Sequence, residues 1–205
     1  MIAIIDYGVG NLFSLQSSLK FIGADAEVTN DIAKIKAADR IILPGVGAFA
    51  DAIRKLRESG MEQVVLEEAA NGKPLLGICL GMQMLLEKSY EYGEHAGLGL
   101  IGGSVKPIAP MIGTGLKVPH IGWNRLIFPK EKEKSKLFQY INEGDCVYFV
   151  HSYAGADCDA FVSARTEYGA ELTAAVERGN VYGTQFHPEK SGEVGLQILK
   201  AFCEL

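Results

Sequence analysis

Hydrophobic and polar positions follow two different patterns along the first half of the chain. In the segment 11–23, Leu12, Leu15 and Leu19 recur at the spacing of one helix face, and Asn11 stands where it can cap that helix. The other segments with a helical pattern are 48–59, 61–72, 80–89 and, at the end of the chain, 191–205. Short apolar runs predict strands at 2–6, 24–30, 39–45 and 73–79.

The second half differs, because strand-like segments follow one another closely. They cover residues 146–153, 160–166, 172–177 and 181–187, and 178–180 fits a hairpin turn between the last two. Strands that alternate with helices predict a parallel sheet with crossover helices. We therefore expect one domain over residues 1–205 with a three-layer α/β fold. Its mostly parallel central sheet is flanked by helices and extended by antiparallel strands from the second half.

Charge and composition argue against several classes of protein. The formal charge is −5, whereas nucleic-acid binding needs clustered Lys and Arg. No apolar stretch is long enough to span a membrane, and the N-terminal apolar run lacks the basic region of a signal peptide. The 4 cysteines form no C-x-x-C pair and no Cys/His cluster at zinc spacing, which fits free thiols. We predict a cytoplasmic protein without nucleic acid, membrane, metal or cofactor.

A thiol stands between two glycines where the strand 73–79 gives way to a helical pattern. The sequence Gly77-Ile-Cys79-Leu-Gly81 matches the nucleophile elbow of α/β hydrolases, in which glycines permit a sharp turn that exposes the nucleophile. The following helix would point its N-terminus at the thiol and favour the thiolate. The Leu80 N–H would lie where it can donate to an oxyanion. A buried cysteine between closely packed glycines explains this stretch equally well.

A base for such a nucleophile occurs in the second half. The stretch "GTQFHPEKSG" places His187 at the end of a predicted strand, with Glu189 two residues later. Histidine can accept a thiol proton, and a carboxylate can hold the imidazole in one tautomer and orientation. A surface histidine beside an unrelated glutamate is the simpler interpretation, but the elbow and this motif together favour a Cys-His-Glu triad.

Several longer stretches carry a family resemblance. "PLLGICLGMQMLLE" and "GTQFHPEKSG" resemble the class I, triad-type glutamine amidotransferases over essentially the whole chain. "IIDYGVGNLFSL", "LPGVGAF", "PHIGWN" and "YFVHSY" resemble the branch that supplies ammonia to a cyclase in histidine biosynthesis. The resemblance implies that glutamine is hydrolysed to glutamate and ammonia. It also implies a separate (β/α)8-barrel cyclase chain as partner, in a heterodimer.

The resemblance assigns roles to matching positions. It implies that Cys79 forms a γ-glutamyl thioester, that His187 transfers protons and that Glu189 orients His187. The N–H of Val46, in "PGVG", joins that of Leu80 as an oxyanion donor. The implied substrate-binding residues are Gly47, Gln83, Glu91, His151, Ser152 and Tyr153.

A second implied group lies near the partner interface or its ammonia portal. It consists of Asn11, His120, Trp123, Tyr148 and Lys190. Simpler roles remain open for three of them: Trp123 in packing, Asn11 as a helix cap, and Lys190 as a solvated side chain.

Other functions fit less well. "DYGVGN" lacks the third glycine of a dinucleotide loop, because Phe13 occupies that position, and His95 has no obvious metal partner. The glutaminase of pyridoxal phosphate synthase, whose ammonia also enters a barrel, does not suit "DYGVGN" and "PHIGWN". A dienelactone-hydrolase-like enzyme would share the triad but act on esters. A catalytically silent binding subunit would be expected to lose the nucleophile or the base.

Overall fold

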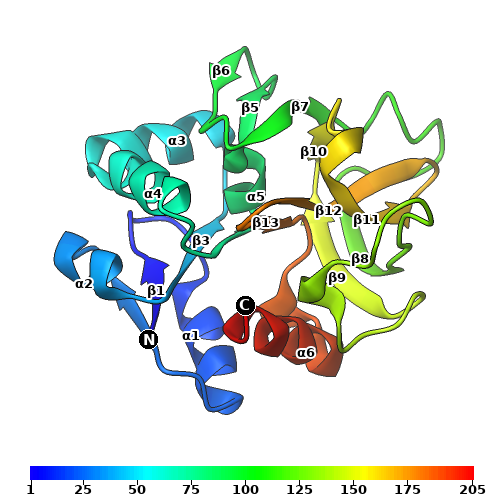
Figure 1. The fold of residues 1–205 in the computed structure, drawn as a ribbon. Coiled ribbons are helices and arrows are strands. Elements are labelled where there is room, and N and C mark those ends of the chain that lie inside the picture. The colour runs from blue at the N-terminus through cyan, green and yellow to red at the C-terminus, as the bar shows by residue number, and fades with distance from the viewer.

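The computed structural model describes residues 1–205 and is built around a seven-stranded sheet (Figure 1). Its strands are β1 (Ile2–Ile5), β2 (Ala26–Thr29), β3 (Arg40–Gly45), β4 (Leu75–Cys79), β11 (Val162–Glu167), β12 (Glu171–Arg178) and β13 (Val181–Thr184). The order is β11-β12-β13-β4-β3-β1-β2. The strands from β13 to β2 in this order run parallel to one another. At the other edge, β12 pairs antiparallel with both β13 and β11. β4 is therefore central, between parallel neighbours.

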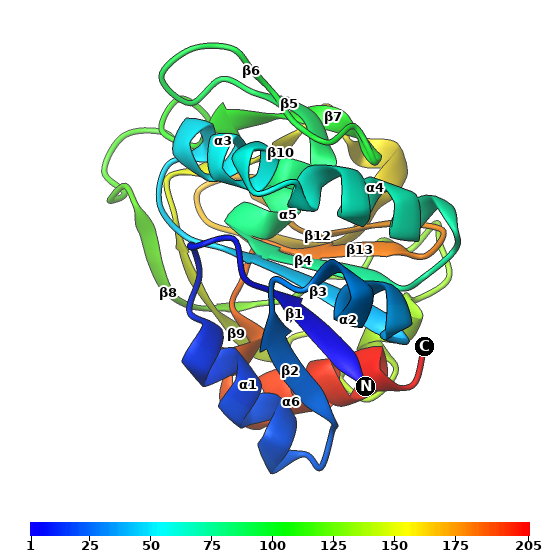
Figure 2. The same ribbon diagram turned by 90° about the vertical axis from the view of Figure 1, so that its left-hand side faces the viewer.

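Helices cover both faces of this sheet (Figure 2). α1 (Leu12–Phe21) and α6 (Gly192–Cys203) lie on one face, where they share a cluster of 22 buried apolar residues with β1 and β9 (Cys146–His151). The opposite face carries α2 (Ile32–Ala37), α3 (Phe49–Glu58), α4 (Met61–Ala70) and α5 (Leu80–Leu85), over a cluster of 28. Burial of these two apolar layers is the main stabilising contribution to the fold.

Two smaller sheets lie beside the central one. A four-stranded sheet has the order β10 (Tyr153–Ala156), β7 (Ile101–Pro107), β5 (Leu86–Ser89), β6 (His95–Ala96). β8 (His120–Arg125) pairs with β9 in an antiparallel ribbon. Three 3-10 helices complete the structure: η1 (Lys136–Phe138), η2 (Asp159–Phe161) and η3 (Pro188–Lys190).

The predicted fold class is confirmed, including the antiparallel strands from the second half. The hairpin turn is also confirmed, since Arg178 pairs with Val181. Three element predictions are wrong in extent. The helix at 80–89 ends at Leu85, because Leu86 turns to an extended conformation and pairs with Ile101. The strand at 146–153 breaks at Ser152 into β9 and β10, and the strand at 181–187 ends at Thr184.

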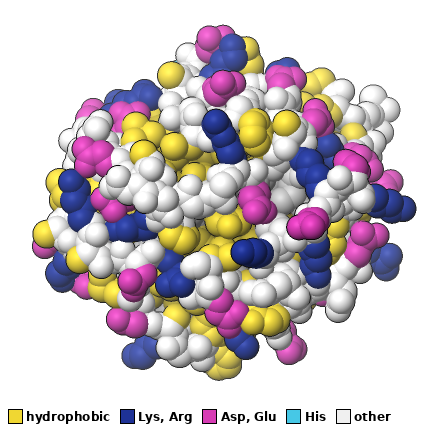
Figure 3. All heavy atoms as spheres, in the orientation of Figure 1, with side chains coloured by type: hydrophobic (Ala, Val, Ile, Leu, Met, Phe, Trp, Pro, Cys, Tyr) yellow, Lys and Arg dark blue, Asp and Glu magenta, His cyan; other side chains and the backbone are white.

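On the face in Figure 3, acidic and basic side chains are interspersed, and no broad basic patch is visible. None of the helices combines the length and the apolar character that crossing a membrane would require.

Candidate active site

Cys79 is the last residue of β4 and stands at a strained turn. Its backbone has φ 56° and ψ −111°, a conformation that is rare for a non-glycine residue and recurs at functional sites. The turn is possible because the surrounding glycines have no side chain. A Cβ on Gly81 would lie 1.9 Å from the Leu43 carbonyl oxygen, and a Cβ on Gly77 would lie 2.8 Å from the Gly81 backbone. The predicted strand-to-helix elbow is therefore present.

Replacing Gly81 with alanine is expected to destabilise the protein by about 3 kcal/mol, because the new methyl group meets backbone that cannot move aside. This corresponds to a melting temperature lower by roughly 6–12 °C. Gly155→Ala is the matched control, since its Cβ would make only ordinary contacts of 3.4–3.5 Å. Equal melting temperatures for the two variants would contradict the packing explanation.

His187 and Glu189 lie next to this turn. The Glu189 Oε1 atom is 2.8 Å from His187 Nδ1, and both side chains are almost fully buried. The backbone on either side is fixed, because the His187 N–H donates to the Tyr148 carbonyl at 3.0 Å. The Ser191 hydroxyl donates to the His187 carbonyl at 2.6 Å and accepts from the Tyr148 N–H at 2.9 Å. Sequence reasoning missed Ser191, although it lies within the quoted "HPEKSG" motif.

Contacts with charged partners control the protonation of His187. Burial alone would lower its pKa, but hydrogen bonds and charge interactions with Cys79 and Glu189 reverse this effect and raise the pKa to about 9. His187 is therefore in the imidazolium form at neutral pH, with its Nδ1 atom facing the Glu189 side chain and Cys79 on the cavity side. Such an arrangement can activate a thiol and later protonate a leaving group.

The loop after β3 brings a second backbone N–H beside the elbow. Gly45 pairs with Cys79 in the sheet, so Val46 lies near Leu80. The Tyr7 hydroxyl donates to the Pro44 carbonyl at 2.7 Å and fixes the start of this loop. Gly47 has φ 94°, no atom lies within 4 Å of its Cβ position, and the Val46 N–H makes no hydrogen bond within the protein.

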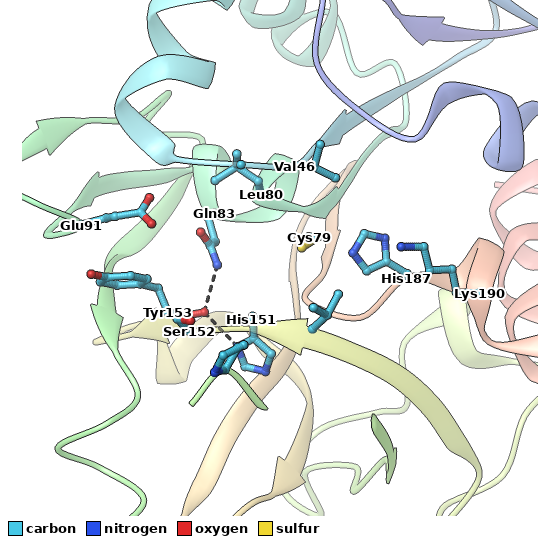
Figure 4. Close-up of a pocket in the computed structure, with 13 residues that line it drawn as sticks. Val46, Cys79, Leu80, Gln83, Glu91, His151, Ser152, Tyr153, His187 and Lys190 are labelled. Carbon is cyan, nitrogen blue, oxygen red and sulfur yellow. Dashed lines mark hydrogen bonds between the residues drawn. The ribbon is translucent and has the colours of Figure 1, made fainter. Parts of the chain in front are cut away.

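A cavity of about 370 Å³ opens over Cys79 (Figure 4). It brings together all the predicted catalytic, oxyanion and substrate-binding residues except Glu189, which lies behind His187. The lining residues are Val46, Gly47, Cys79, Leu80, Gln83, Glu91, Pro119, Val150, His151, Ser152, Tyr153, His187 and Lys190. Glu91 also accepts a hydrogen bond from the Phe49 N–H at 2.5 Å and so holds the N-terminus of α3.

His151 lines the cavity and forms a buried pair with His120, which lies behind it. His151 Nδ1 is 2.9 Å from the Tyr153 carbonyl, and His151 Nε2 is 3.0 Å from His120 Nδ1. Burial lowers the pKa of His151 to about 4, so this ring is neutral at neutral pH. Burial also lowers the pKa of His120.

Three of the five predicted interface residues, namely Trp123, Tyr148 and Lys190, form one group at the surface, in which Tyr148 is half-buried. Trp123 is 54% exposed and makes an edge contact with Tyr148 at 6.1 Å, and Lys190 Nζ lies 6.0 Å from the Tyr148 ring. His120 does not belong to this surface. It is 1% exposed and stacks between the Phe149 and Tyr168 rings, because its side chain points inward from β8.

Asn11 also differs from its prediction as a cap. It occupies the N-cap position of α1, but its side chain makes no capping hydrogen bond. It instead lines a small recess with Val46 and Glu189, beside the triad. No group of three or more His, Cys, Asp or Glu side chains is arranged to hold a metal.

The comparisons with known proteins agree with this geometry. The family model described as glutamine amidotransferase class-I matches residues 3–204. The imidazole glycerol phosphate synthase subunit HisH of Wolinella succinogenes is 50% identical, over 100% of both chains. The HisH subunit of Methanothermobacter thermautotrophicus is 51% identical, over 100% of this chain and 98% of its own.

Solved structures show the same fold at low sequence identity. One described as a glutamine amidotransferase has a TM-score of 0.76 and 21% identity, covering 100% of this chain and 98% of its own. PurLQS from Thermotoga maritima gives 0.74 and 22%, over 99% of this chain and 97% of its own. The two HisH sequence matches, by contrast, cover almost the whole length of this chain and of each relative. Together with the family model, they show that this chain belongs to the class I glutamine amidotransferases and, within them, to the HisH family.

Proposed function

We propose that this chain, with residues 1–205 acting as one cytoplasmic domain, hydrolyses glutamine to glutamate and ammonia for imidazole glycerol phosphate synthesis. The observation that carries the proposal is the position of Cys79. It stands on a strained elbow, beside a His187–Glu189 pair, at the base of a cavity lined by the other expected substrate-binding residues. The assignment of the relatives to imidazole glycerol phosphate synthase supports this destination for the ammonia.

The chemistry proceeds in two stages. The Cys79 thiolate attacks the carboxamide carbon, and the N–H groups of Leu80 and Val46 stabilise the tetrahedral oxyanion. The His187 imidazolium then gives its proton to the amide nitrogen, and the C–N bond breaks. Ammonia departs, and the γ-glutamyl group remains on Cys79 as a thioester. Water, deprotonated by His187, attacks the thioester carbonyl. The C–S bond breaks and glutamate is released, while Glu189 holds the imidazole orientation throughout.

The substrate's α-ammonium group is bound between Gln83 and Glu91. Gln83 donates from Nε2 to the Tyr153 carbonyl at 3.0 Å and to Gln185 Oε1 at 3.0 Å, which uses both of its amide hydrogens. Its Oε1 atom is then left as an acceptor for the ammonium group, and the Glu91 carboxylate supplies the opposite charge. The backbone of 151–153 and the open approach at Gly47 complete the binding site.

Ammonia passes to a separate (β/α)8-barrel cyclase that binds the surface group of Trp123, Tyr148 and Lys190. There it reacts with a phosphoribulosyl formimino carboxamide nucleotide and gives imidazole glycerol phosphate and aminoimidazole carboxamide ribotide. The support is this surface group itself, which is joined to the triad because the His187 N–H donates to the Tyr148 carbonyl.

Glutamate release from glutamine tests this function, measured with and without the barrel cyclase and its nucleotide ligand. We expect glutamate release to require both the cyclase and its nucleotide ligand, and to be lost in Cys79→Ala. Activity on esters but not on glutamine would instead favour a different cysteine hydrolase.

The loop at 44–49 is proposed to control this activity by withholding its oxyanion donor until the cyclase ligand binds. Gly47 has a positive φ of 94°, which proline cannot adopt, and nothing packs against its Cβ position. Gly47→Pro should still fold, because nothing packs against this position, but the loop can no longer take its present conformation. The ratio of stimulated to basal glutamate release should therefore change by about tenfold or more, since one oxyanion donor is worth ~10²–10³ in rate. A ratio equal to that of the unchanged protein would contradict a mobile loop.

A further inference from the structure

Gln185 is a buried residue between β13 and His187 to which the sequence analysis assigned no role. Its side chain is fully buried, and its Nε2 atom lies 3.8 Å from the Cys79 sulfur. His187 lines the same cavity as Cys79, and its interaction with this thiol contributes to its raised pKa. The sulfur therefore has two polar neighbours, from either end of the segment 185–187.

The direction of the Gln185 amide follows from its neighbours. The Tyr153 carbonyl can only accept hydrogen bonds, so the Gln83 atom 3.0 Å away must be the Nε2 donor. The same Gln83 nitrogen lies 3.0 Å from Gln185, whose facing atom must then be the Oε1 acceptor. The other amide atom of Gln185 is consequently the N–H donor, and it faces the sulfur of Cys79.

The Tyr153 carbonyl is itself held from the other side by the histidine pair. His151 must donate its Nδ1–H to this carbonyl at 2.9 Å, which leaves His151 Nε2 to accept from His120 Nδ1–H at 3.0 Å. Figure 4 shows His151 and Gln83 converging on the one carbonyl oxygen. The hydrogen bonds thus run in one consistent direction, and each side chain involved is at most 8% exposed.

We propose that Gln185 donates a hydrogen bond that stabilises the Cys79 thiolate, with Gln83 as the positioning residue that holds the amide in that direction. The inference rests on the proposed function of Cys79 as nucleophile. A donor N–H favours an anion over its neutral form, and such contacts shorten when the sulfur carries its full charge. Gln185 complements His187, because a neutral amide keeps its donor at any pH.

Other charged groups around the sulfur must be held constant in a test. Burial raises the pKa of Tyr7, and the charge of Cys79 adds to this. The titratable side chains that face Cys79 or line its cavity are Tyr7, Glu91, His151, Tyr153, His187 and Lys190.

The test is the pH dependence of Cys79 alkylation by iodoacetamide in the isolated chain, followed by mass spectrometry of the Cys79 peptide. Gln185→Met keeps the volume but removes the donor. We expect the alkylation midpoint to rise by about one pH unit, as for loss of a hydrogen bond to a charged group. In the complex with the cyclase and its ligand, kcat/KM for glutamine should fall about tenfold with KM little changed.

Thr184→Val is the matched control. It lies next to Gln185, is fully buried and loses a hydrogen bond to the Phe186 carbonyl without touching the sulfur. Its alkylation midpoint should equal that of the unchanged protein. If Gln185→Met does not fold, Gln185→Asn retains the amide but is one methylene too short, and it should show a smaller upward shift.

The outcomes separate the two proposals. An unchanged midpoint in a folded Gln185 variant, or an equal shift in Thr184→Val, would overturn the role of Gln185 while leaving Cys79 as nucleophile. Glutamine hydrolysis that survives Cys79→Ala would instead overturn Cys79 as the nucleophile, and an absence of glutamine hydrolysis in the unchanged complex would overturn the proposed function, whatever the alkylation midpoints are.

Discussion

Replacing Cys79 with alanine should reduce glutamate release by about 10⁴-fold or more, because removing the nucleophile of a covalent mechanism leaves only binding and oxyanion stabilisation. Cys79 is the only thiol that lines the cavity. The variant should still bind glutamine, since Gln83 and Glu91 are unchanged. The measurement is the rate of glutamate release by the complex with its nucleotide ligand, together with calorimetric titration of glutamine into the same complex.

The control for this variant is Cys146→Ala. Cys146 lies on β9, is half-buried and lines a different cavity near Arg125. It should retain nearly full activity. Glutamate release by Cys79→Ala above about one hundredth of the unchanged rate would show that the reaction does not need the thioester.

Local patterns were sufficient to predict the elbow and the motif that faces it. Gly77, Cys79 and Gly81 are close in sequence, and the turn they form depends on atoms of that same stretch and its neighbouring strand. His187 and Glu189 are likewise two residues apart and contact each other directly at 2.8 Å. The periodicity in 11–23 and 48–59 predicted α1 and α3 to within two residues, because each helix buries one face and exposes the other.

The errors arose where burial or distant pairing decides the structure. All six residues of α5 are buried, so no polar face marks its end, and β5 forms only because Leu86 meets Ile101. The sequence pattern did not predict α2 or the strands β5 to β8, some of which are short. β6, for example, is only 2 residues long. Gln185 and His120 show the same limit within the site, since their partners come from other elements.

Replacing Glu189 with glutamine should lower kcat/KM at neutral pH by about 10²–10⁴-fold, because an amide can hold the imidazole in the wrong tautomer and cannot stabilise its charge. Burial alone lowers the pKa of His187, and its contacts with Cys79 and Glu189 raise it to about 9. Removing the carboxylate should therefore lower this pKa. We expect the alkaline limb of the kcat/KM profile to move from about pH 9 to lower pH by about one unit or more.

The same shift affects stability. The folded-state pKa of about 9 lies above the unfolded value of 6.5. The contribution of His187 is therefore fully present below pH 6.5 and is lost as the pH rises through about 9. In Glu189→Gln this loss should still begin near pH 6.5 but be complete at lower pH and be smaller. Glu193→Gln, an exposed change in the first turn of α6, should leave both profiles unchanged. An alkaline limb that stays near pH 9 in Glu189→Gln would show that Cys79 alone holds the proton on His187, and would reduce Glu189 to a packing residue.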